Sequence, residues 1–388
     1  MTLQLTRLAL TDFRNYRSLV WQPAARISAI AGPNGSGKTN LLEAVSLLVP
    51  GRGLRGARVA ELARRGPAAS GRWAVAARFA TGAGRMDVGT GTASDGPDDR
   101  RSFRLDGVAP RSQAEIAQRL AAVWLTPQMD RLFLEGASGR RRFLDRLAWA
   151  LEPAHAREVA AHDTALASRN RLLAEGGRDP SWLAGLEDAI ARHAVAATAA
   201  RVALVTRLNA ALADGAAAPF PAARLDLRDP IAARLQGEPA LAVEDWLREA
   251  LAAGRAQDAA AGSASVGAHR ADVGLADAET GLAAADASTG QQKALLIGIV
   301  LGHAALIAEA RGFAPLLLLD EPAVHLDPSR RRALFAALAR LPGQALLTGT
   351  DAETFHPLRG VAEGLRTGDG ALVADPAFPP VTPVPATL

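Results

Sequence analysis

The chain has 388 residues, of which 49% are hydrophobic and 22% charged, with a formal net charge of +4 at pH 7. This length can hold two domains, or one large domain with an insertion. The absence of cysteine excludes disulfides, thiolate metal sites and cysteine nucleophiles. No apolar run approaches the roughly eighteen residues of a membrane span, and the N-terminus lacks a signal-peptide pattern. We therefore expect a cytoplasmic protein without membrane contact.

The first 110 residues predict a mixed sheet with one crossover helix. Period-two alternation of apolar residues indicates strands, and helical spacing indicates the helix. The predicted elements are a strand at 3–10, a turn at 12–16, a buried strand at 26–31, a helix at 40–49, and strands at 73–79 and 103–105 joined by a polar hairpin around 94–99.

Residues 111–264 predict a helical lobe inserted into this sheet domain. Two alanine- and leucine-rich helical runs, 139–174 and 180–213, are separated by a short turn, which indicates an antiparallel hairpin. At 1.5 Å per residue, about 35 residues would form an arm of about 50 Å. The apolar positions do not form strict heptads, so we expect a packed lobe and not a long coiled coil. A linker at 214–223 and a helix at 241–261 complete the lobe.

Sheet character returns near residue 265. Residues 315–321 form an apolar run ending in two carboxylates, which is typical of a central parallel strand, and 344–348 predict a second buried strand. The proline-rich end, 375–388, predicts a disordered tail. The predicted fold is therefore α/β: a nucleotide-binding head with a mixed and parallel sheet, formed by residues 1–110 and 265–374, with a helical lobe at 111–264.

Residues 32–39 match the phosphate-loop pattern G-x-x-x-x-G-K-[ST], in the required context of strand, turn and helix. Lys38 is expected to reach the β- and γ-phosphates of ATP, and the Thr39 hydroxyl to sit on Mg²⁺. The flanking strand and helix argue against a chance glycine turn as the source of the match. Lys38 is also one of only two lysines in an arginine-rich chain, and an arginine could not replace its compact ammonium in a tight phosphate loop. The predicted nucleotide-binding residues here are Gly32, Pro33, Asn34, Gly35, Ser36, Gly37, Lys38, Thr39 and Asn40.

Two carboxylates follow the leucine-rich strand. Asp320 is predicted to hold Mg²⁺, through water, opposite Thr39, and Glu321 to orient or deprotonate the attacking water. An apolar run ending in Asp-Glu is common by chance, but a phosphate loop earlier in the same chain favours the functional interpretation. Gln128, between the sheet and the lobe, is predicted to sense Mg²⁺ and water and to transmit the nucleotide state to the lobe, and it is a candidate catalytic and metal-binding residue.

The segment Ser288-Thr289-Gly290-Gln291-Gln292-Lys293 opens a predicted helix. Taken alone it favours an ordinary helix cap, although a hydroxyl and an amide at a helix N-terminus can also bind an anion. Its place between the phosphate loop and the Asp-Glu strand favours a signature loop that completes the active site of a second subunit. Asp327 follows Glu321 at the distance expected of a loop that contacts that subunit.

Arginines crowd the segment after the first helix, with Glu61 as the one opposing charge. Such a field attracts phosphate backbones without reading sequence. Solvated helix faces, or contact of these arginines with the nucleotide, remain open alternatives. The candidate DNA-contacting residues are Arg52, Arg55, Arg58, Arg64 and Arg65.

Together these motifs resemble those of ABC-type ATPases, and in detail the chain resembles the SMC-like RecF family over nearly its whole length. The residues that carry the resemblance are the segments 10–16, 136–145, 267–272, 288–293 and 346–351. The resemblance implies an ATP-dependent homodimer and weak, DNA-stimulated ATP hydrolysis. It also implies binding to DNA at single-strand gaps, and action with RecR and RecO to load RecA.

Three features depart from the pattern of relatives. Thr348-Gly349-Thr350 occupies the place of a switch histidine, and His356 comes later in the chain. Gln128 and Glu321-Pro322 are closer to the wider ABC pattern, which leaves the turnover rate open. One alternative is an ABC-type ATPase subunit of another machine, a transporter or a translation-type module, although the chain shows no membrane segment or second cassette. Another is a switch in which ATP binding alone acts and hydrolysis only resets it.

Overall fold

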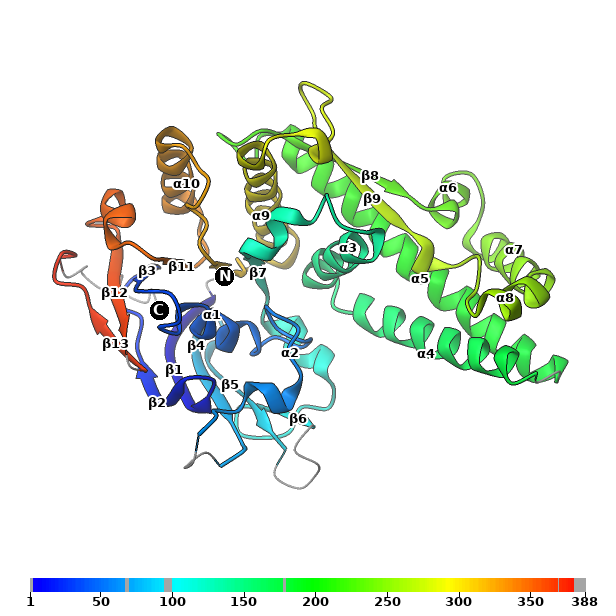
Figure 1. The fold of residues 1–388 in the computed structure, drawn as a ribbon, viewed down its shortest axis with the longest axis horizontal. Helices are drawn as coiled ribbons and strands as arrows, with labels where there is room; N and C mark the ends of the chain where they lie inside the picture. The colour runs from blue at the N-terminus through cyan, green and yellow to red at the C-terminus, as the bar shows by residue number, and fades with distance from the viewer. Residues whose placement is uncertain (1–2, 67–69, 94–99, 177–178, 369, 380–388) are drawn as a thin grey trace. The chain divides into compact units, whose positions relative to one another are not determined.

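The computed structural model describes residues 3–66, 70–93, 100–176, 179–368 and 370–379 (Figure 1). The chain divides into two compact units, which are described separately. The head unit comprises Met1–Asp130, Gly215–Pro221 and Ser288–Leu388, and the helical unit comprises Arg131–Asp214 and Ala222–Ala287.

The head unit contains an antiparallel sheet with strand order β2-β1-β4-β5-β6. Alternate residues of β1, including Leu8 and Leu10, are buried, as the sequence pattern predicts, and a register shift between Leu5 and Arg7 accounts for the break in alternation. The polar, glycine-rich strand β5 was missed, and the hairpin predicted around 94–99 lies outside the described residues. The strands are β1 (Leu3–Phe13), β2 (Tyr16–Trp21), β4 (Ala74–Thr81), β5 (Gly84–Thr92) and β6 (Arg101–Leu105).

The second sheet of the head unit has strand order β13-β12-β3-β11-β10-β7, and all neighbours are parallel except the edge pair β13–β12. Every residue of the inner strands β3, β10 and β11 and of the edge strand β7 is buried, as expected of strands that are covered on both faces, whereas β12 mixes buried and exposed residues. Parallel pairing brings the carboxyl ends of these strands to one edge of the sheet, where α/β proteins bind ligands. The strands are β3 (Ile27–Ala31), β7 (Ala122–Leu125), β10 (Leu316–Leu319), β11 (Ala345–Gly349), β12 (Ala362–Gly368) and β13 (Ala371–Ala374).

Helices α1 (Lys38–Ser46), α2 (Gln113–Arg119), α9 (Thr289–Arg311) and α10 (Pro328–Arg340) complete the head unit, with the short 3₁₀ helices η1 (Val59–Leu62), η2 (Pro127–Arg131) and η5 (Ala352–Leu358). Helix α9 is apolar on all sides because it is a core helix. The helix ends at Arg311 and is capped by Gly312, whose φ of 71° is the left-handed conformation typical of a glycine cap.

The expectation that no apolar run approaches a membrane span needs one correction. By length and composition, two helices among the described residues could cross a membrane: α9 and α5 (Pro180–Ala213). Of their most apolar windows, 78% in α9 and 44% in α5 are buried inside the protein. Since core helices pass the same test, this is weak evidence for a membrane span.

The helical unit is built mainly on the packing of α4 and α5, with a two-stranded antiparallel sheet of β8 and β9 (Figure 1). The run predicted at 139–174 is two helices, because Pro153 lacks the amide that helix continuation needs. The strands β8 and β9 were not predicted within the lobe. The remaining elements are α3 (Ala137–Leu151), α4 (His155–Ala174), α6 (Pro230–Leu235), α7 (Ala240–Ala253), α8 (Arg255–Ala261), β8 (Ala223–Arg228), β9 (Asp272–Asp277), η3 (Ala268–Arg270) and η4 (Ala284–Asp286).

A buried ionic network links four helices of the helical unit. Arg169 of α4 is fully buried and donates to Glu187 at 3.0 Å, to Asp258 at 2.8 Å and to the carbonyl oxygen of Leu251 at 2.7 Å. These partners come from α5, α8 and α7. One guanidinium therefore links four helices, and its charge is balanced by two carboxylates, as burial requires.

The sequence placed boundaries after residues 110 and 264. In the structure β7 pairs with β10, so residues 111–130 belong to the head unit, and β9 pairs with β8, so 265–287 belong to the helical unit. Segment Gly215–Pro221, predicted as linker, also belongs to the head unit, where the Pro221 carbonyl lies against Gly298 of α9.

The prediction of a disordered tail from 375 is wrong for its first five residues. Asp375 is 2% exposed and pairs with Arg366 at 2.9 Å, while the ring of Phe378 is buried against Gly364 of β12. A buried aromatic ring and an ion pair fix this segment, although its composition is proline-rich. Residues 380–388 lie outside the described residues.

Candidate nucleotide-binding site

The loop between β3 and α1 has the backbone geometry of a phosphate cradle. Gly35 and Gly37 adopt positive φ angles of 81° and 106°, which favour glycine. A Cβ at Gly32 would lie 2.7 Å from the Thr367 hydroxyl, so a side chain there would collide. Helix α1 starts at Lys38 without a side-chain cap, which leaves the amides of its first turn available to an anion. The predicted strand, loop and helix are confirmed.

The Lys38 side chain lies inside this loop. Its ammonium donates to the carbonyl oxygens of Gly32 at 2.8 Å and Pro33 at 3.0 Å, and the residue is 4% exposed. Burial lowers the pKa of Lys38, and the charges of Glu321 and Asp320 act in the opposite direction. An ammonium carries three donors, so one remains for a phosphate oxygen.

Asp320 accepts hydrogen bonds from two other elements of the site. Its Oδ1 accepts hydrogen bonds from the Thr39 hydroxyl at 2.9 Å and from the Thr348 hydroxyl at 2.7 Å. Asp320 is 4% exposed and Thr348 is fully buried. The register that pairs Leu319 with Leu347 sets Asp320 beside Thr348 at the ends of β10 and β11. From the sequence, Thr348 is expected only to occupy the place of a switch histidine, and its contact with Asp320 is not predicted.

Glu321 has an unusual backbone that is held on both sides. Its φ is +49°, a left-handed conformation that residues other than glycine seldom adopt and that often occurs at functional sites. Its amide donates to the Thr348 hydroxyl at 3.0 Å, and its carbonyl oxygen accepts from the Lys293 ammonium at 3.5 Å. The backbone that directs the Glu321 carboxylate is therefore fixed by side chains of β11 and α9.

The residues around Thr39 suit a magnesium ion shared with phosphates. Across the part of the chain that the structure describes, no group of three or more His, Asp or Glu side chains could hold a metal. Mg²⁺ needs few protein ligands, because one or two oxygens plus waters and substrate phosphates complete its shell. The Thr39 hydroxyl and the Asp320 carboxylate are hard oxygen donors that already lie together, so the donor set fits Mg²⁺.

The turn between β1 and β2 braces the phosphate loop. The Asn15 amide donates to the Ser36 carbonyl at 3.1 Å and its oxygen accepts from Asn40 at 2.8 Å. The Tyr16 hydroxyl donates to the Gly37 carbonyl at 3.0 Å. The sequence predicted the turn at 12–16 but gave no signal for this long-range contact.

Two arginines converge on a buried carboxylate of α1. Arg14 donates twice to Glu43, at 2.7 and 2.8 Å, and the Glu43 side chain is fully buried. Arg55 reaches the same carboxylate at 3.4 Å and the Asn40 side chain at 2.6 Å. At least one arginine of the candidate DNA segment therefore lies against α1, beside the phosphate loop.

The other candidate DNA residues differ in exposure. Arg64 is partly buried and pairs with Asp12 at 2.7 Å, and this pairing lowers the pKa of the Asp12 carboxyl. Arg52, Arg58 and Arg65 are exposed. The five arginines are thus divided between partners within the head unit and solvent, and their contact with DNA or with the nucleotide stays a prediction.

The predicted signature and subunit-contact loops are helix caps in this chain. Ser288 accepts from the Gln291 amide at 3.3 Å, and the Gln291 side chain accepts from the Ser288 amide at 2.9 Å, which completes a capping box. Asp327 caps α10 by accepting from the amides of Ser329 and Arg330, both at 2.9 Å. Ser288, Gln291 and Asp327 are exposed, and their role towards a second subunit stays a prediction.

Gln128 lies on η2 with its side chain exposed. None of the hydrogen bonds found among the described residues joins it to Thr39 or Asp320, so its predicted role in sensing Mg²⁺ stays untested. The site contact of this segment comes from Asp130, which pairs with Lys293 at 3.0 Å. The contact of Asp130 is not predicted from the sequence, since a single carboxylate after a strand forms no recognisable motif.

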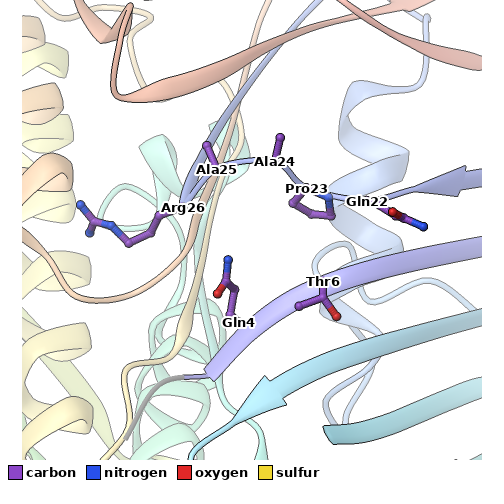
Figure 2. Close-up of a pocket in the computed structure, with 7 residues that line it drawn as sticks. All are labelled: Gln4, Thr6, Gln22, Pro23, Ala24, Ala25 and Arg26. Atoms are coloured by element: carbon purple, nitrogen blue, oxygen red, sulfur yellow. The ribbon is translucent and has the colours of Figure 1, made fainter. Parts of the chain in front are cut away.

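A polar pocket of about 280 Å³ lies at the opposite end of β3 from the phosphate loop (Figure 2). It occupies the space between the start of β1 and the segment that leads into β3. Arg26 is turned away to the carbonyls of Ala339 at 2.6 Å and Leu338 at 3.5 Å. The pocket is therefore separate from the nucleotide site. Its lining residues are Gln4, Thr6, Gln22, Pro23, Ala24, Ala25 and Arg26.

The phosphate loop after β3, the Asp-Glu pair after β10 and the capped helix α9 together define the head of an ABC-type ATPase of the SMC kind. The family model for the RecF/RecN/SMC N terminal domain matches residues 4–363. The chain is 45% identical over 370 residues to the DNA replication and repair protein RecF of Mesorhizobium japonicum, covering 95% of this chain and 97% of that one. The corresponding protein of Allorhizobium ampelinum is 46% identical, with coverages of 95% and 98%. The chain therefore belongs to the RecF family.

Solved structures show the same fold. A structure of the recombination mediator protein RecF with ATP, of the RecFOR pathway, superposes with a TM-score of 0.82 at 21% identity, covering 96% of this chain and 98% of that one. An SMC head bound to the C-terminal winged-helix domain of ScpA gives a TM-score of 0.55 at 15% identity, covering 96% of both chains. The predicted α/β fold with an ABC-type head is confirmed.

Proposed function

We propose that this protein is a cytoplasmic, ATP-dependent DNA-binding protein of recombinational repair and replication-fork maintenance. Its ATP-bound homodimer binds DNA at single-strand gaps and, with RecR and RecO, promotes the loading of RecA. Support comes from relatives named DNA replication and repair protein RecF that are more than 40% identical over about 95% of this chain. The observation that carries the proposal is the convergence of Thr39 and Thr348 on Asp320 beside the Lys38 loop.

In this proposal the head unit binds and slowly hydrolyses ATP. Lys38 and the loop amides hold the phosphates, while Thr39 and Asp320 hold Mg²⁺, which would neutralise phosphate charge. Glu321 orients the attacking water and accepts its proton. The bond between the γ-phosphorus and the β–γ bridging oxygen breaks, giving ADP and phosphate. Gln128 senses the occupied metal site.

The second subunit completes each site. Ser288, Gly290 and Gln291 of one subunit cap the ATP held by the other, with Asp327 at the same interface. The exposure of Ser288, Gln291 and Asp327 supports this, because capping groups must reach the partner. Two closed sites then hold the dimer around DNA, with contacts from the candidate DNA arginines Arg52, Arg55, Arg58, Arg64 and Arg65.

The test compares wild type with Lys38→Met in three assays: binding of a fluorescent ATP analogue, phosphate release, and binding to gapped and fully duplex DNA. We expect wild type to bind the analogue, to release phosphate faster with DNA, and to prefer gapped DNA only when ATP is present. Lys38→Met should lose all three properties. Gap binding that is equal with and without ATP would contradict the proposal.

A further inference from the structure

The chain has two lysines, Lys38 in the phosphate loop and Lys293, and every other long basic side chain is arginine. Lys293 lies on α9, five positions after Ser288, and its side chain is 1% exposed. A lysine buried to this degree needs partners for its charge. Its described partners are the Asp130 carboxylate at 3.0 Å and the Glu321 carbonyl oxygen at 3.5 Å.

These contacts join three segments of the head unit. Asp130 belongs to η2, which follows β7, whereas Glu321 follows β10. The other side of the Glu321 peptide is held by Thr348 at 3.0 Å. Glu321 has a left-handed backbone with φ of +49°. Its amide is held by an acceptor, the Thr348 hydroxyl, and its carbonyl oxygen is held by a donor, the Lys293 ammonium.

We infer that Lys293 is a positioning residue for Glu321: through its bonds to Asp130 and to the Glu321 carbonyl, it holds the water-activating carboxylate in its working direction. This inference rests on the proposed function, in which Glu321 acts on the attacking water. The Thr348 hydroxyl alone fixes only the amide side of the residue, and rotation about the next bonds would move the carboxylate. Lys293 restrains the carbonyl side, so both ends of the Glu321 backbone, and with them the start of its side chain, are held, and Asp130 keeps the ammonium in place.

Charge arguments favour a positioning role over a purely stabilising one. A buried ion pair is weak evidence for stability, because desolvation offsets most of its attraction. The Oδ1 atom of Asp130 is buried without a described hydrogen-bond partner, so the pair is not optimised as a structural bridge. A compact ammonium suits the point contact with one carbonyl oxygen, whereas the planar fork of arginine does not.

The test measures ATP affinity and the maximal hydrolysis rate separately in Lys293→Met, Asp130→Asn, the double variant and Lys293→Arg. We expect Lys293→Met to lower kcat roughly 10- to 100-fold, the loss that follows misplacement of a reacting group. ATP affinity should change less than about threefold, since Lys293 does not touch the phosphate loop, and Lys293→Arg should restore part of kcat. The two single changes should be non-additive, because they break one shared bond.

Glu309→Gln, an exposed change on the same helix, is the matched control and should leave kcat and ATP affinity unaltered. A wild-type kcat in Lys293→Met would overturn the inference while leaving the proposed function intact. If Lys293→Met does not fold, a wild-type kcat in Asp130→Asn overturns it equally.

A wild-type protein that binds ATP without hydrolysing it would refute the hydrolytic part of the proposed function. In that case amide hydrogen exchange tests the positioning role of Lys293 without a hydrolysis assay. Faster exchange at 321–326 in Lys293→Met or Asp130→Asn, with unaltered exchange in α1, supports the positioning bond. Unaltered exchange at 321–326 overturns it.

Discussion

Thr39 and Asp320 are 281 residues apart in the sequence and are joined by a hydrogen bond of 2.9 Å. Thr39 is the last residue of the phosphate-loop motif and lies on α1, and Asp320 comes directly after β10. Strand β11 lies between β3 and β10, and its Thr348 bonds to the same carboxylate oxygen. Helix α1 and the ends of strands β10 and β11 thus bring the oxygens of Thr39, Asp320 and Thr348 together, where a metal and the phosphates of a nucleotide would bind.

Asp320→Asn should reduce Mg²⁺-dependent ATP hydrolysis at least about 100-fold, because an amide is a much weaker ligand for a hard cation than a carboxylate. Thr348→Ala should reduce it less, roughly 10-fold, since it leaves the ligand but removes a bond that orients it. Initial rates over a range of Mg²⁺ concentrations measure both effects. Rates equal to wild type in Asp320→Asn at all Mg²⁺ concentrations would exclude Asp320 as the metal residue.

Glu321→Gln should bind ATP normally but stop hydrolysis, because the amide cannot accept the proton of the attacking water. Dimers bound to DNA should then persist, which gel filtration with labelled gapped DNA can follow. If ATP binding alone drives the action on DNA, this variant still supports RecA loading in the presence of RecR and RecO. If hydrolysis drives it, loading is lost.

Arg55→Ala with Arg58→Ala should weaken DNA affinity and flatten its salt dependence. Each lost phosphate contact lowers the slope of log affinity against log salt by about 0.9. The control is Arg192→Ala with Arg228→Ala, which removes the same charge from exposed ion pairs of the helical unit.

Titrations at several salt concentrations, with ATP affinity measured in parallel, separate the two interpretations of this segment. Weaker ATP binding with an unaltered salt slope would assign Arg55 to the nucleotide, which its contact with Asn40 makes geometrically accessible. If neither the salt dependence of DNA affinity nor ATP binding changes, Arg55 and Arg58 contact neither DNA nor the nucleotide.

Arg169→Met should destabilise the helical unit strongly. It leaves Glu187 and Asp258 buried without their shared cation, and breaking such a pair costs about 3–5 kcal/mol. Chemical denaturation followed by circular dichroism measures the change. Arg192→Ala, which breaks the exposed pair with Asp188, should cost under about 1 kcal/mol. Equal, small losses in both variants would show that the network adds little stability.

Sequence reasoning found the phosphate loop and the Asp-Glu strand because both are local patterns with a fixed physical purpose. Lys38 and Thr39 occupy positions that a strand, a glycine turn and a helix define within a dozen residues. Asp320 follows a leucine run that is typical of a buried parallel strand. The same method missed Thr348, whose contact depends on the register between β10 and β11.

The misses elsewhere share this cause. Strand β8 was not predicted within the helical lobe, because it pairs with β9, which lies far away in the sequence. Residues 375–379 were taken as disordered from their proline content, whereas the burial of Phe378 against Gly364 decides their structure. Asp130 and Lys293 form a pair across 163 residues, and no local spacing could connect them.

In the proposed dimer, the exposed cap of α9 completes a nucleotide site on a second copy of the chain. Light scattering can test it by measuring the molar mass of wild type and of Ser288→Arg, each with and without Mg·ATP. We expect a wild-type monomer that becomes a dimer only with Mg·ATP, and a Ser288→Arg protein that binds ATP but stays monomeric. A wild type that remains monomeric in saturating Mg·ATP, or a Ser288→Arg protein that dimerises as wild type does, would contradict it.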